Sequence, residues 1–364
     1  MSSQRRYDAI VVGAGTIGGA ALYHLARRGL RVLGLDAHTP PHEHGSMHGE
    51  TRIIRLAYHE HPDYVPLLRR AYELWHELDP TLVHRVGSVD VGPEDGAVVG
   101  GALRALEQHG IAYERGRSGA LSVPRGHVAL FQPDGGFVEA ERAIRAHLEA
   151  AAAAGADLRT GEAARAWSPG SVETERGVYE AERLVLCPGT SAAELLALPP
   201  ELFAVERQVV AWFDAPGLDG GPVYVCEEDD GANHYGIAAG GRLKAGLMHC
   251  GELAPVVEFV RRRVPGAREL VATQTCWFTN TPDRHFVLDL HPASPAVAIA
   301  SVCSGHGFKF APVAGEALAD LVTEGGTPLP IGFLGIRRLL SERDSRVAAC
   351  ASSWPAAKSP IPAD

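Results

Sequence analysis

The sequence of 364 residues lacks the closely spaced cysteines that mark structural zinc sites and redox dithiols. Its six cysteines are far apart, and no two form a C-x-x-C pair: Cys187, Cys226, Cys250, Cys276, Cys303 and Cys350. We therefore expect most of them to be reduced thiols in the core. The sequence also lacks an apolar run long enough to span a bilayer and a signal-peptide segment before the first strand, which predicts a cytoplasmic protein.

Positive charge is scarce as well, since 34 Lys and Arg residues stand against 44 Asp and Glu, for a formal net charge of -10. This balance argues against nucleic acid or an anionic membrane as a partner. The histidines of 41–44 and 59–61 have ligand-like spacing, but they lie in polar, loop-like sequence without a recognised partner, so we expect no metal. What remains, 46% hydrophobic and 21% charged residues, is an ordinary globular composition at a length that suits two domains.

The N-terminal region carries a dinucleotide-binding pattern. An apolar strand over 7–12 precedes a G-x-G-x-x-G sequence, a helical pattern to residue 29 and a second strand over 32–35. This full strand–helix–strand setting predicts nucleotide binding, where glycines alone would fit any tight turn. Its expected ligand-binding residues are Gly13 for the turn, Gly15 for approach to the pyrophosphate, Gly18 for helix packing and Asp36 for a ribose hydroxyl.

A second strand and glycine turn lies near the C-terminus, where an apolar run over 297–302 leads into Cys303-Ser304-Gly305-His306-Gly307-Phe308-Lys309 and a helical pattern over 313–322. Gly305 and Gly307 allow close backbone approach to a ligand. His306 and Lys309 add donors suited to an electron-rich cofactor edge or a substrate carboxylate. The alternative is a tight turn with a surface lysine and a packed histidine.

Three more cations lie in informative settings. Arg52 and Arg55 are three residues apart, so on a helix they would point roughly to one face, and the arginine fork suits bidentate carboxylate recognition. The alternative is a solvated face on which both arginines pair with surface acids such as Glu50. Lys244 lies in apolar, strand-like sequence, where it has either a functional role or an exit to solvent from an edge strand.

The rest of the pattern concerns the order of elements. We expect an amphipathic helix over 64–78, an alanine-rich helix over 139–154, and a further parallel strand within 156–166. The strand and glycine over 184–190 indicate a return to the nucleotide-binding domain. The β-rich segments that begin near residues 86 and 205 are therefore interpreted as insertions.

These motifs resemble the monomeric sarcosine oxidase and N-methyltryptophan oxidase family of FAD-dependent amine oxidases, within the wider glycine oxidase and D-amino-acid oxidase fold. The resemblance covers 7–338 and rests on five segments: Val11–Gly15, His48–Arg55, Val205–Val210, Thr281–Asp283 and Ser304–Lys309. It implies an α/β protein with a Rossmann-like FAD-binding domain assembled from separated segments and an inserted β-sheet-rich (α+β) substrate domain. The predicted ranges are 1–86, 142–195 and 280–346 for the FAD-binding domain, 87–141 and 196–279 for the substrate domain, and 347–364 for a disordered tail.

The same resemblance implies roles for individual residues. Arg55 and Lys309 match the pair that holds the substrate carboxylate, and Lys244 matches a lysine that promotes reaction with oxygen. Cys276 matches a cysteine linked to the 8α-methyl of FAD, and Cys303 is the poorer candidate for that linkage. The implied sites are catalytic Lys244, Arg52 and His306, substrate-binding Arg55, Lys309 and Tyr235, and cofactor-binding Gly13, Gly15, Gly18, Asp36, Ser46, Thr51, Cys276, Gly305, Gly307 and Lys309.

The activity implied is oxygen-dependent oxidation of a secondary, N-methyl amino acid, giving an imine and hydrogen peroxide, by a monomer. Two alternatives stay open. One is a flavin oxidase or dehydrogenase of the same fold that acts on a primary or cyclic amine in a biosynthetic pathway. The other is a nucleotide-binding protein whose flavin is structural or absent. Relatives often carry a histidine where this chain has Met248, so the role of the next residue, His249, is left undecided.

Overall fold

The computed structural model describes residues 6–340, which form two compact units. Among these residues, unit 1 comprises 6–45, 144–205 and 279–340, and unit 2 comprises 46–143 and 206–278. Each unit is thus assembled from separated segments. The units differ from the predicted domains over 46–86, which the sequence assigns to the FAD-binding domain and which belongs to unit 2 by its contacts. They differ also over 196–205, which the sequence assigns to the substrate domain and which belongs to unit 1. The predicted tail over 347–364 lies outside the described residues.

Unit 1 is built on an eight-stranded sheet whose central order is β12-β1-β2-β9, all parallel, with β19 also parallel to β12. Parallel strands covered on both faces are apolar throughout, which explains the run Ile10-Val11-Val12. The strands are β1 (Arg6–Val12), β2 (Val32–Leu35), β9 (Asp157–Arg159), β10 (Ala164–Ser168), β11 (Ser171–Thr174), β12 (Gly177–Leu186), β18 (Val287–His291) and β19 (Ser294–Ser301).

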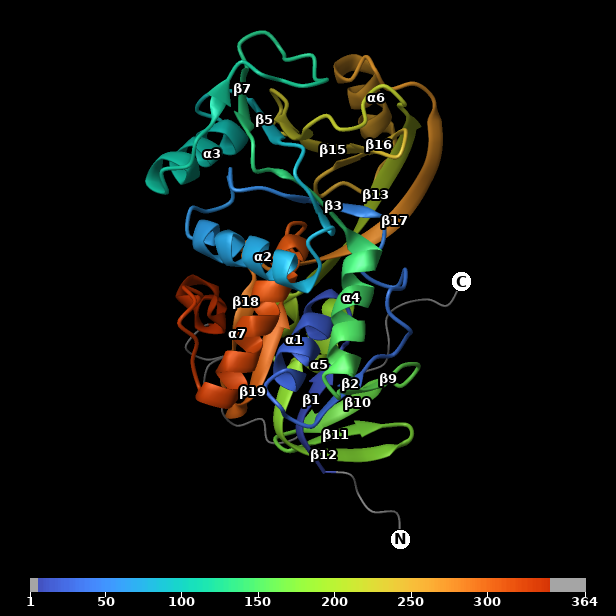
Figure 1. Ribbon diagram of the computed structural model, residues 1–364, viewed down its shortest axis with the longest axis vertical. Coiled ribbons are helices and arrows are strands. Elements are labelled where there is room, and N and C mark those ends of the chain that lie inside the picture. Colours follow the sequence, from blue (N-terminus) through green and yellow to red (C-terminus); the bar gives the residue numbers. More distant parts are fainter. Residues whose placement is uncertain (1–5, 341–364) are drawn as a thin grey trace. The chain divides into compact units, whose positions relative to one another are not determined.

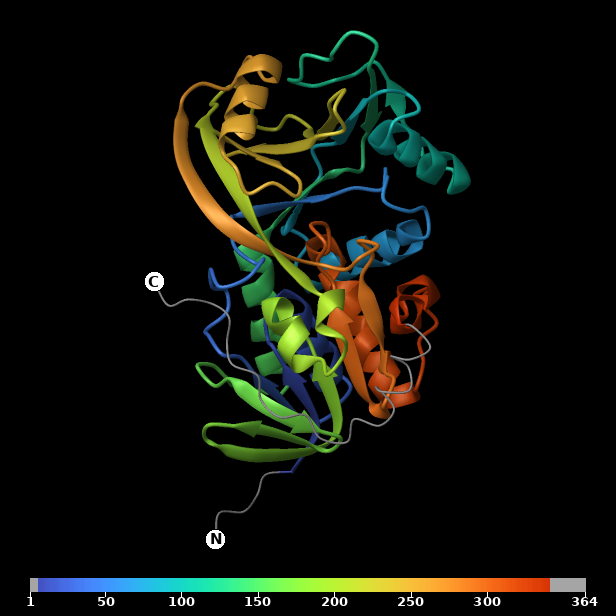
Figure 2. The ribbon, with the colours of Figure 1, turned by 180° about the vertical axis from the view of Figure 1, so that it is seen from behind.

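The helices of unit 1 cover both faces of this sheet. Figure 1 shows α1 (Thr16–Ala26) and α7 (Ala311–Glu324) packed side by side on one face. Figure 2 shows α5 (Ala192–Leu195) on the other face, where its neighbours Leu196 and Leu198 join the apolar core. Short 3-10 turns complete the unit: η1 (Gly189–Ser191), η2 (Pro200–Leu202), η3 (Phe308–Phe310), η4 (Gly332–Leu334) and η5 (Ile336–Leu339).

Unit 2 is built on a second eight-stranded sheet of order β17-β13-β16-β15-β14-β5-β7-β6 and a small sheet of order β3-β8-β4. The large sheet contains β5 (Ser88–Gly92), β6 (Glu114–Arg115), β7 (Val128–Gln132), β13 (Ala204–Asp214), β14 (Val223–Glu227), β15 (Asn233–Ala239), β16 (Arg242–Leu247) and β17 (Leu270–Asn280). The small sheet contains β3 (Thr51–Ile54), β4 (Val83–His84) and β8 (Gly136–Glu139). The helices are α2 (Tyr64–Leu78), α3 (Ala97–Gln108) and α6 (Ala254–Arg263), while α4 (Ala140–Ala153) continues into unit 1.

The two faces of the large sheet differ in character. Directly paired residues of antiparallel strands share a face, and alternate residues along each strand follow them. One face is apolar and packs on α6 through residues such as Phe213, Leu243 and Phe259. The opposite face carries Tyr235 and Lys244, because the register pairs Tyr235 with Gly246 and Lys244 with Ile237. The polar residues predicted to have a function are therefore sorted onto one face.

Two helices and one strand expected from the sequence are confirmed. The amphipathic helix over 64–78 is α2 at both ends, and its buried side includes Leu67, Leu68 and Trp75. The alanine-rich helix is α4, and the strand expected within 156–166 is β9, parallel to β2. The five cysteines within 6–340 form no disulfide, but only Cys226 and Cys276 are buried, so the expectation that most cysteines lie in the core is wrong for this range. None of the helices in this range combines the length and apolar character that a membrane crossing requires.

Candidate functional site

The first candidate site is the glycine turn between β1 and α1 in unit 1. Gly13 has φ +82°, and a Cβ there would overlap the carbonyl oxygen of Cys187. A Cβ at Gly18 would overlap the carbonyl oxygen of Gly13, so both positions require glycine. Gly15 is the N-cap of α1 and contributes no side-chain cap, which leaves the helix start facing the turn with backbone amides. This cradle fits the pyrophosphate of a dinucleotide.

Asp36 closes this turn from the end of β2. Its carboxylate accepts hydrogen bonds from the backbone N–H groups of Ala14 and His38, each at 2.9 Å. The side chain is buried, so Asp36 fixes the glycine turn against the second strand. Its expected role in ribose binding stays a prediction.

The second glycine turn follows β19. His306 is buried, and its Nε2 lies 3.1 Å from the carbonyl oxygen of Arg284. Lys309 is also buried, and its Nζ donates to the carbonyl oxygen of His306 at 2.8 Å. The alternative of a surface lysine at this turn is therefore wrong. The turn places an ammonium group inside unit 1, where its burial needs compensation by polar or anionic groups.

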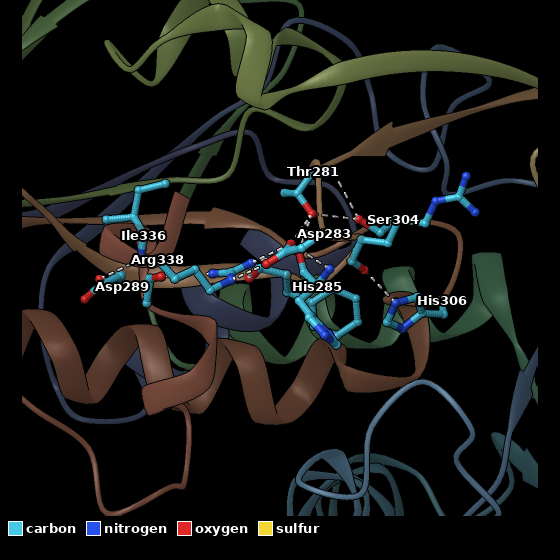
Figure 3. Close-up of polar contacts among 11 residues, drawn as sticks. Thr281, Asp283, His285, Asp289, Ser304, His306, Ile336 and Arg338 are labelled. Carbon is cyan, nitrogen blue, oxygen red and sulfur yellow. Dashed lines mark hydrogen bonds and ion pairs between the residues drawn. The ribbon is translucent and has the colours of Figure 1, made fainter. Parts of the chain in front are cut away.

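A polar network holds this turn in place (Figure 3). Thr281 donates to Asp283 at 3.1 Å, and the N–H of Thr281 points to the Ser304 hydroxyl at 3.4 Å. Arg338 contacts both oxygens of Asp283, at 2.8 and 3.2 Å, and donates to the carbonyl oxygens of His285 and Phe286. The segment Thr281–Asp283, which the sequence offered only as part of a resemblance, thus links the glycine turn to η5.

Lys244 is the central candidate in unit 2. It lies on β16, between β13 and β15, and only 4% of the residue is exposed. Its Nζ donates to the carbonyl oxygens of Gly49 and Thr51, both at 2.6 Å. Burial, and then the charge of Arg52, lower the pKa of Lys244 well below its usual range. The alternative of a lysine that leaves an edge strand for solvent is therefore wrong.

Arg52 lies beside Lys244, but the expected helical setting of the two arginines is wrong. Arg52 lies on strand β3, which pairs with β8, and not on a helix. Residues three apart in an extended segment point to opposite faces. Arg52 donates to the carbonyl oxygens of Thr51 at 2.9 Å and Ser46 at 2.7 Å. A Cβ on Gly49 would lie 3.5 Å from Arg52 Nη1 and 3.6 Å from Lys244 Nζ, so two buried or half-buried cations flank this glycine.

Tyr235 and Cys276 complete this group. The Tyr235 ring covers Gly246, where a Cβ would overlap its hydroxyl. Burial raises the pKa of Tyr235, the Cys276 thiol adds to that rise, and Arg52 opposes it. Cys276 is buried on β17, and its thiol opposes the lowering of the Lys244 pKa. Unit 2 therefore gathers Lys244, Arg52, Tyr235 and Cys276 around one face of its sheet.

The remaining predicted residues have simple surroundings. The Ser46 hydroxyl donates to the carbonyl oxygen of Trp277, and the Thr51 side chain is buried. Cys303, the poorer candidate for a flavin link, accepts from the N–H of Thr279 through its sulfur at 3.3 Å. His249 lies 2.9 Å from Glu206. Within 6–340, no three or more His, Cys, Asp or Glu side chains come together as a metal site.

Arg55 has a partner that sequence reasoning missed. It forms a buried ion pair with Asp90 of β5, and its Nη2 lies 2.7 Å from His59 Nδ1. The available signal was a charged residue in the apolar strand Val89-Asp90-Val91, all of whose residues are buried. Arg55, which the resemblance assigns to binding the substrate carboxylate, is thus already paired with a carboxylate of the chain itself.

Residues 8–321 match the family described as FAD dependent oxidoreductase. The chain is 38% identical to monomeric sarcosine oxidase of Streptomyces avermitilis, over 92% of this chain and 98% of that protein. It is 37% identical to N-methyl-L-tryptophan oxidase of Salmonella arizonae, over 88% and 95%. Its fold resembles NikD, an unusual amino acid oxidase essential for nikkomycin biosynthesis, with a TM-score of 0.78, 26% identity and 91% and 97% coverage.

Proposed function

This chain belongs to the FAD dependent oxidoreductase family, and from that premise we propose that it oxidises a secondary, N-methylated amino acid with molecular oxygen. In this reaction a C–H hydrogen next to nitrogen leaves as hydride, with two electrons, and the N–H group loses a proton. The two electrons and two protons convert oxygen to hydrogen peroxide. Water then converts the imine to an aldehyde and an amine. The observation that carries the proposal is the buried Lys244 beside Arg52 in a chain whose relatives are N-methyl amino acid oxidases.

The residues present fit FAD. The overlap that any Cβ would cause at Gly13 and Gly18 supports a pyrophosphate cradle, and Asp36 is placed at its edge. Bound FAD would supply the hydride acceptor and the route of electrons to oxygen. The further residues proposed to hold it are Gly15, Ser46, Thr51, Gly305, Gly307 and Lys309, with a covalent thioether to Cys276.

Each charged residue is proposed to have one task. Arg55 and Lys309 bind the substrate carboxylate, because an amino acid held at its carboxylate presents its C–H in a fixed orientation. Lys244 stabilises negative charge that develops on oxygen, and its two carbonyl partners orient the ammonium group for this. Arg52, Tyr235 and His306 contribute donors around the reacting groups.

A second candidate function is oxidation of a primary or cyclic amine by the same fold. The likeness to NikD favours it, and so does the ion pair of Arg55 with Asp90, since an internal carboxylate makes a substrate carboxylate less necessary. The monomeric state and the cytoplasmic location stay predictions.

The experiment begins with the absorbance spectrum of purified protein before and after acid precipitation. A yellow pellet supports covalent FAD, whereas quantitative release of FAD into the supernatant contradicts the link to Cys276. A panel of N-methyl, primary and cyclic amines with peroxide detection then separates the two candidate functions. Peroxide from primary or cyclic amines alone would overturn the leading proposal.

A further inference from the structure

The ion pair of Arg55 and Asp90 is unusual for its depth. Arg55 is 3% exposed and Asp90 is 0% exposed, so water solvates neither charged group to a useful extent. Asp90 lies in the middle of β5, with Leu130 of β7 and Val225 of β14 as its register partners. These neighbours offer no hydrogen bond from their side chains, and an unpaired carboxylate in such a position is strongly unfavourable. Arg55 is therefore what keeps Asp90 ionised.

Arg55 is surrounded by more negative charge than it carries positive charge. Its guanidinium faces two carboxylates, the ion-paired Asp90 and Glu60, whose oxygen lies 3.6 Å from Arg55 Nη2. When both carboxylates are ionised, one cation therefore faces two anions. A ligand carboxylate that approaches Arg55 therefore meets a site already occupied by like charge.

One oxygen of Asp90 is left over. Among residues 6–340, Asp90 Oδ1 contacts Arg55, whereas Oδ2 is buried without a hydrogen-bond partner. A buried carboxylate oxygen without a donor is poorly stabilised as an anion, which favours the protonated form of the carboxyl group. The ion pair is thus intrinsically easy to weaken by protonation, without movement of the strand.

We propose that Asp90 is a positioning and specificity-determining residue that acts through Arg55: it competes with ligand carboxylates for the guanidinium. This inference rests on the proposed role of Arg55 as carboxylate anchor. Asp90 holds Arg55 in one orientation and lowers its affinity for carboxylates while ionised. When Asp90 is neutral, Arg55 faces one carboxylate fewer and the net charge of the cluster rises by one, so binding of a ligand carboxylate strengthens.

The direction of the pH effect follows. Burial, reinforced by Glu60 and opposed by Arg55, raises the pKa of Asp90 to about 6. The charged groups that act on Asp90 are Arg55 and Glu60, and Tyr58 and His59 of the same segment contact these two residues in turn. The register partners of Asp90 on β7 and β14, Leu130 and Val225, are apolar. Burial also raises the pKa of Tyr58 well above its usual range, so this phenol stays neutral. Carboxylate binding should therefore tighten as pH falls through the Asp90 pKa, with uptake of a proton.

The test measures binding of acetate to the holoenzyme by isothermal titration calorimetry between about pH 6 and about pH 8. For the wild type we expect the Kd of ionised acetate to fall at least about threefold toward the acid end. Asp90→Asn should bind acetate about tenfold more tightly at about pH 8, with little dependence on pH, if acetate raises the Asp90 pKa by about one unit. Ser88→Ala is the matched control, since Ser88 is equally buried and lies two residues earlier on the same face of β5.

Two further variants separate the possible failures. His59→Gln should keep the pH dependence, because loss of it would assign the proton to His59 and overturn the inference. If Arg55→Met binds acetate as the wild type does, the proposed carboxylate anchor itself is wrong. If Arg55→Met weakens acetate binding but binding by the wild type does not depend on pH, Arg55 remains the carboxylate anchor and the role of Asp90 is refuted. This outcome decides the question even if Asp90→Asn does not fold.

Discussion

Replacement of Lys244 by methionine is the most informative perturbation of this chain. The change removes one ammonium group and its two hydrogen bonds to the carbonyl oxygens of Gly49 and Thr51, while a side chain of similar length stays in β16. Oxidation of the amine should slow only modestly, because that step transfers hydride and creates no charge on oxygen. Reaction with oxygen should slow strongly, since negative charge then develops on a neutral molecule.

The magnitude follows from the burial of Lys244. Unit charges about 5 Å apart interact by about 3 kcal/mol at an effective dielectric of about 20, but by less than about 1 kcal/mol in water. At 4% exposure the first value applies, so the rate of reaction with oxygen should fall on the order of a hundredfold. A surface lysine would give an effect of only a few-fold by the same arithmetic.

Stopped-flow absorbance can follow each half-reaction separately, first anaerobic reduction by the amine and then reoxidation by oxygen. Arg242→Met is the matched control, because Arg242 is two residues away on β16 but its side chain is 42% exposed and paired with Glu50. Reoxidation of Lys244→Met at the wild-type rate would refute the reasoning. Equal slowing of both half-reactions would indicate a structural effect instead.

The remaining predictions concern separate parts of the molecule. Wild-type reoxidation should slow as pH rises through the lowered pKa of Lys244, because only the protonated lysine is a cation, whereas Lys244→Met should show no such loss in rate–pH profiles. Yellow colour after acid precipitation should disappear in Cys276→Ala and persist in Cys303→Ala; the reverse result would move the flavin link to Cys303. Lys309→Met should weaken acetate binding by roughly 1.5–3 kcal/mol in calorimetry, and unchanged binding would remove Lys309 from the anchor. Glu227 accepts hydrogen bonds from the N–H groups of Ala97 and Val98 at the start of α3, at 3.2 and 2.8 Å. Glu227→Ala should therefore lower the free energy of unfolding by about 1–2 kcal/mol in chemical denaturation. An unchanged denaturation midpoint would contradict this.

Much of the fold could be predicted from the sequence because its signals are local. The amphipathic period over 64–78 defines α2, and the spacing of Gly13, Gly15 and Gly18 after an apolar strand defines the nucleotide turn. The requirement for glycine at Gly13 and Gly18 is likewise a property of a few neighbouring residues. Family membership followed from several such motifs together, and the comparisons confirm it.

The settings of the charged residues were decided by tertiary structure. Arg52 lies on a strand because β3 is completed by β8, which is more than eighty residues away in the chain. Lys244 is buried because β13 and β15 flank β16, and its hydrogen-bond acceptors at Gly49 and Thr51 are 195 and 193 residues distant. The partner of Arg55 is a single aspartate on another strand. A periodic pattern reports which face of an element is apolar, but burial and partner of a lone charge depend on which distant strands pair, and no local pattern contains that information.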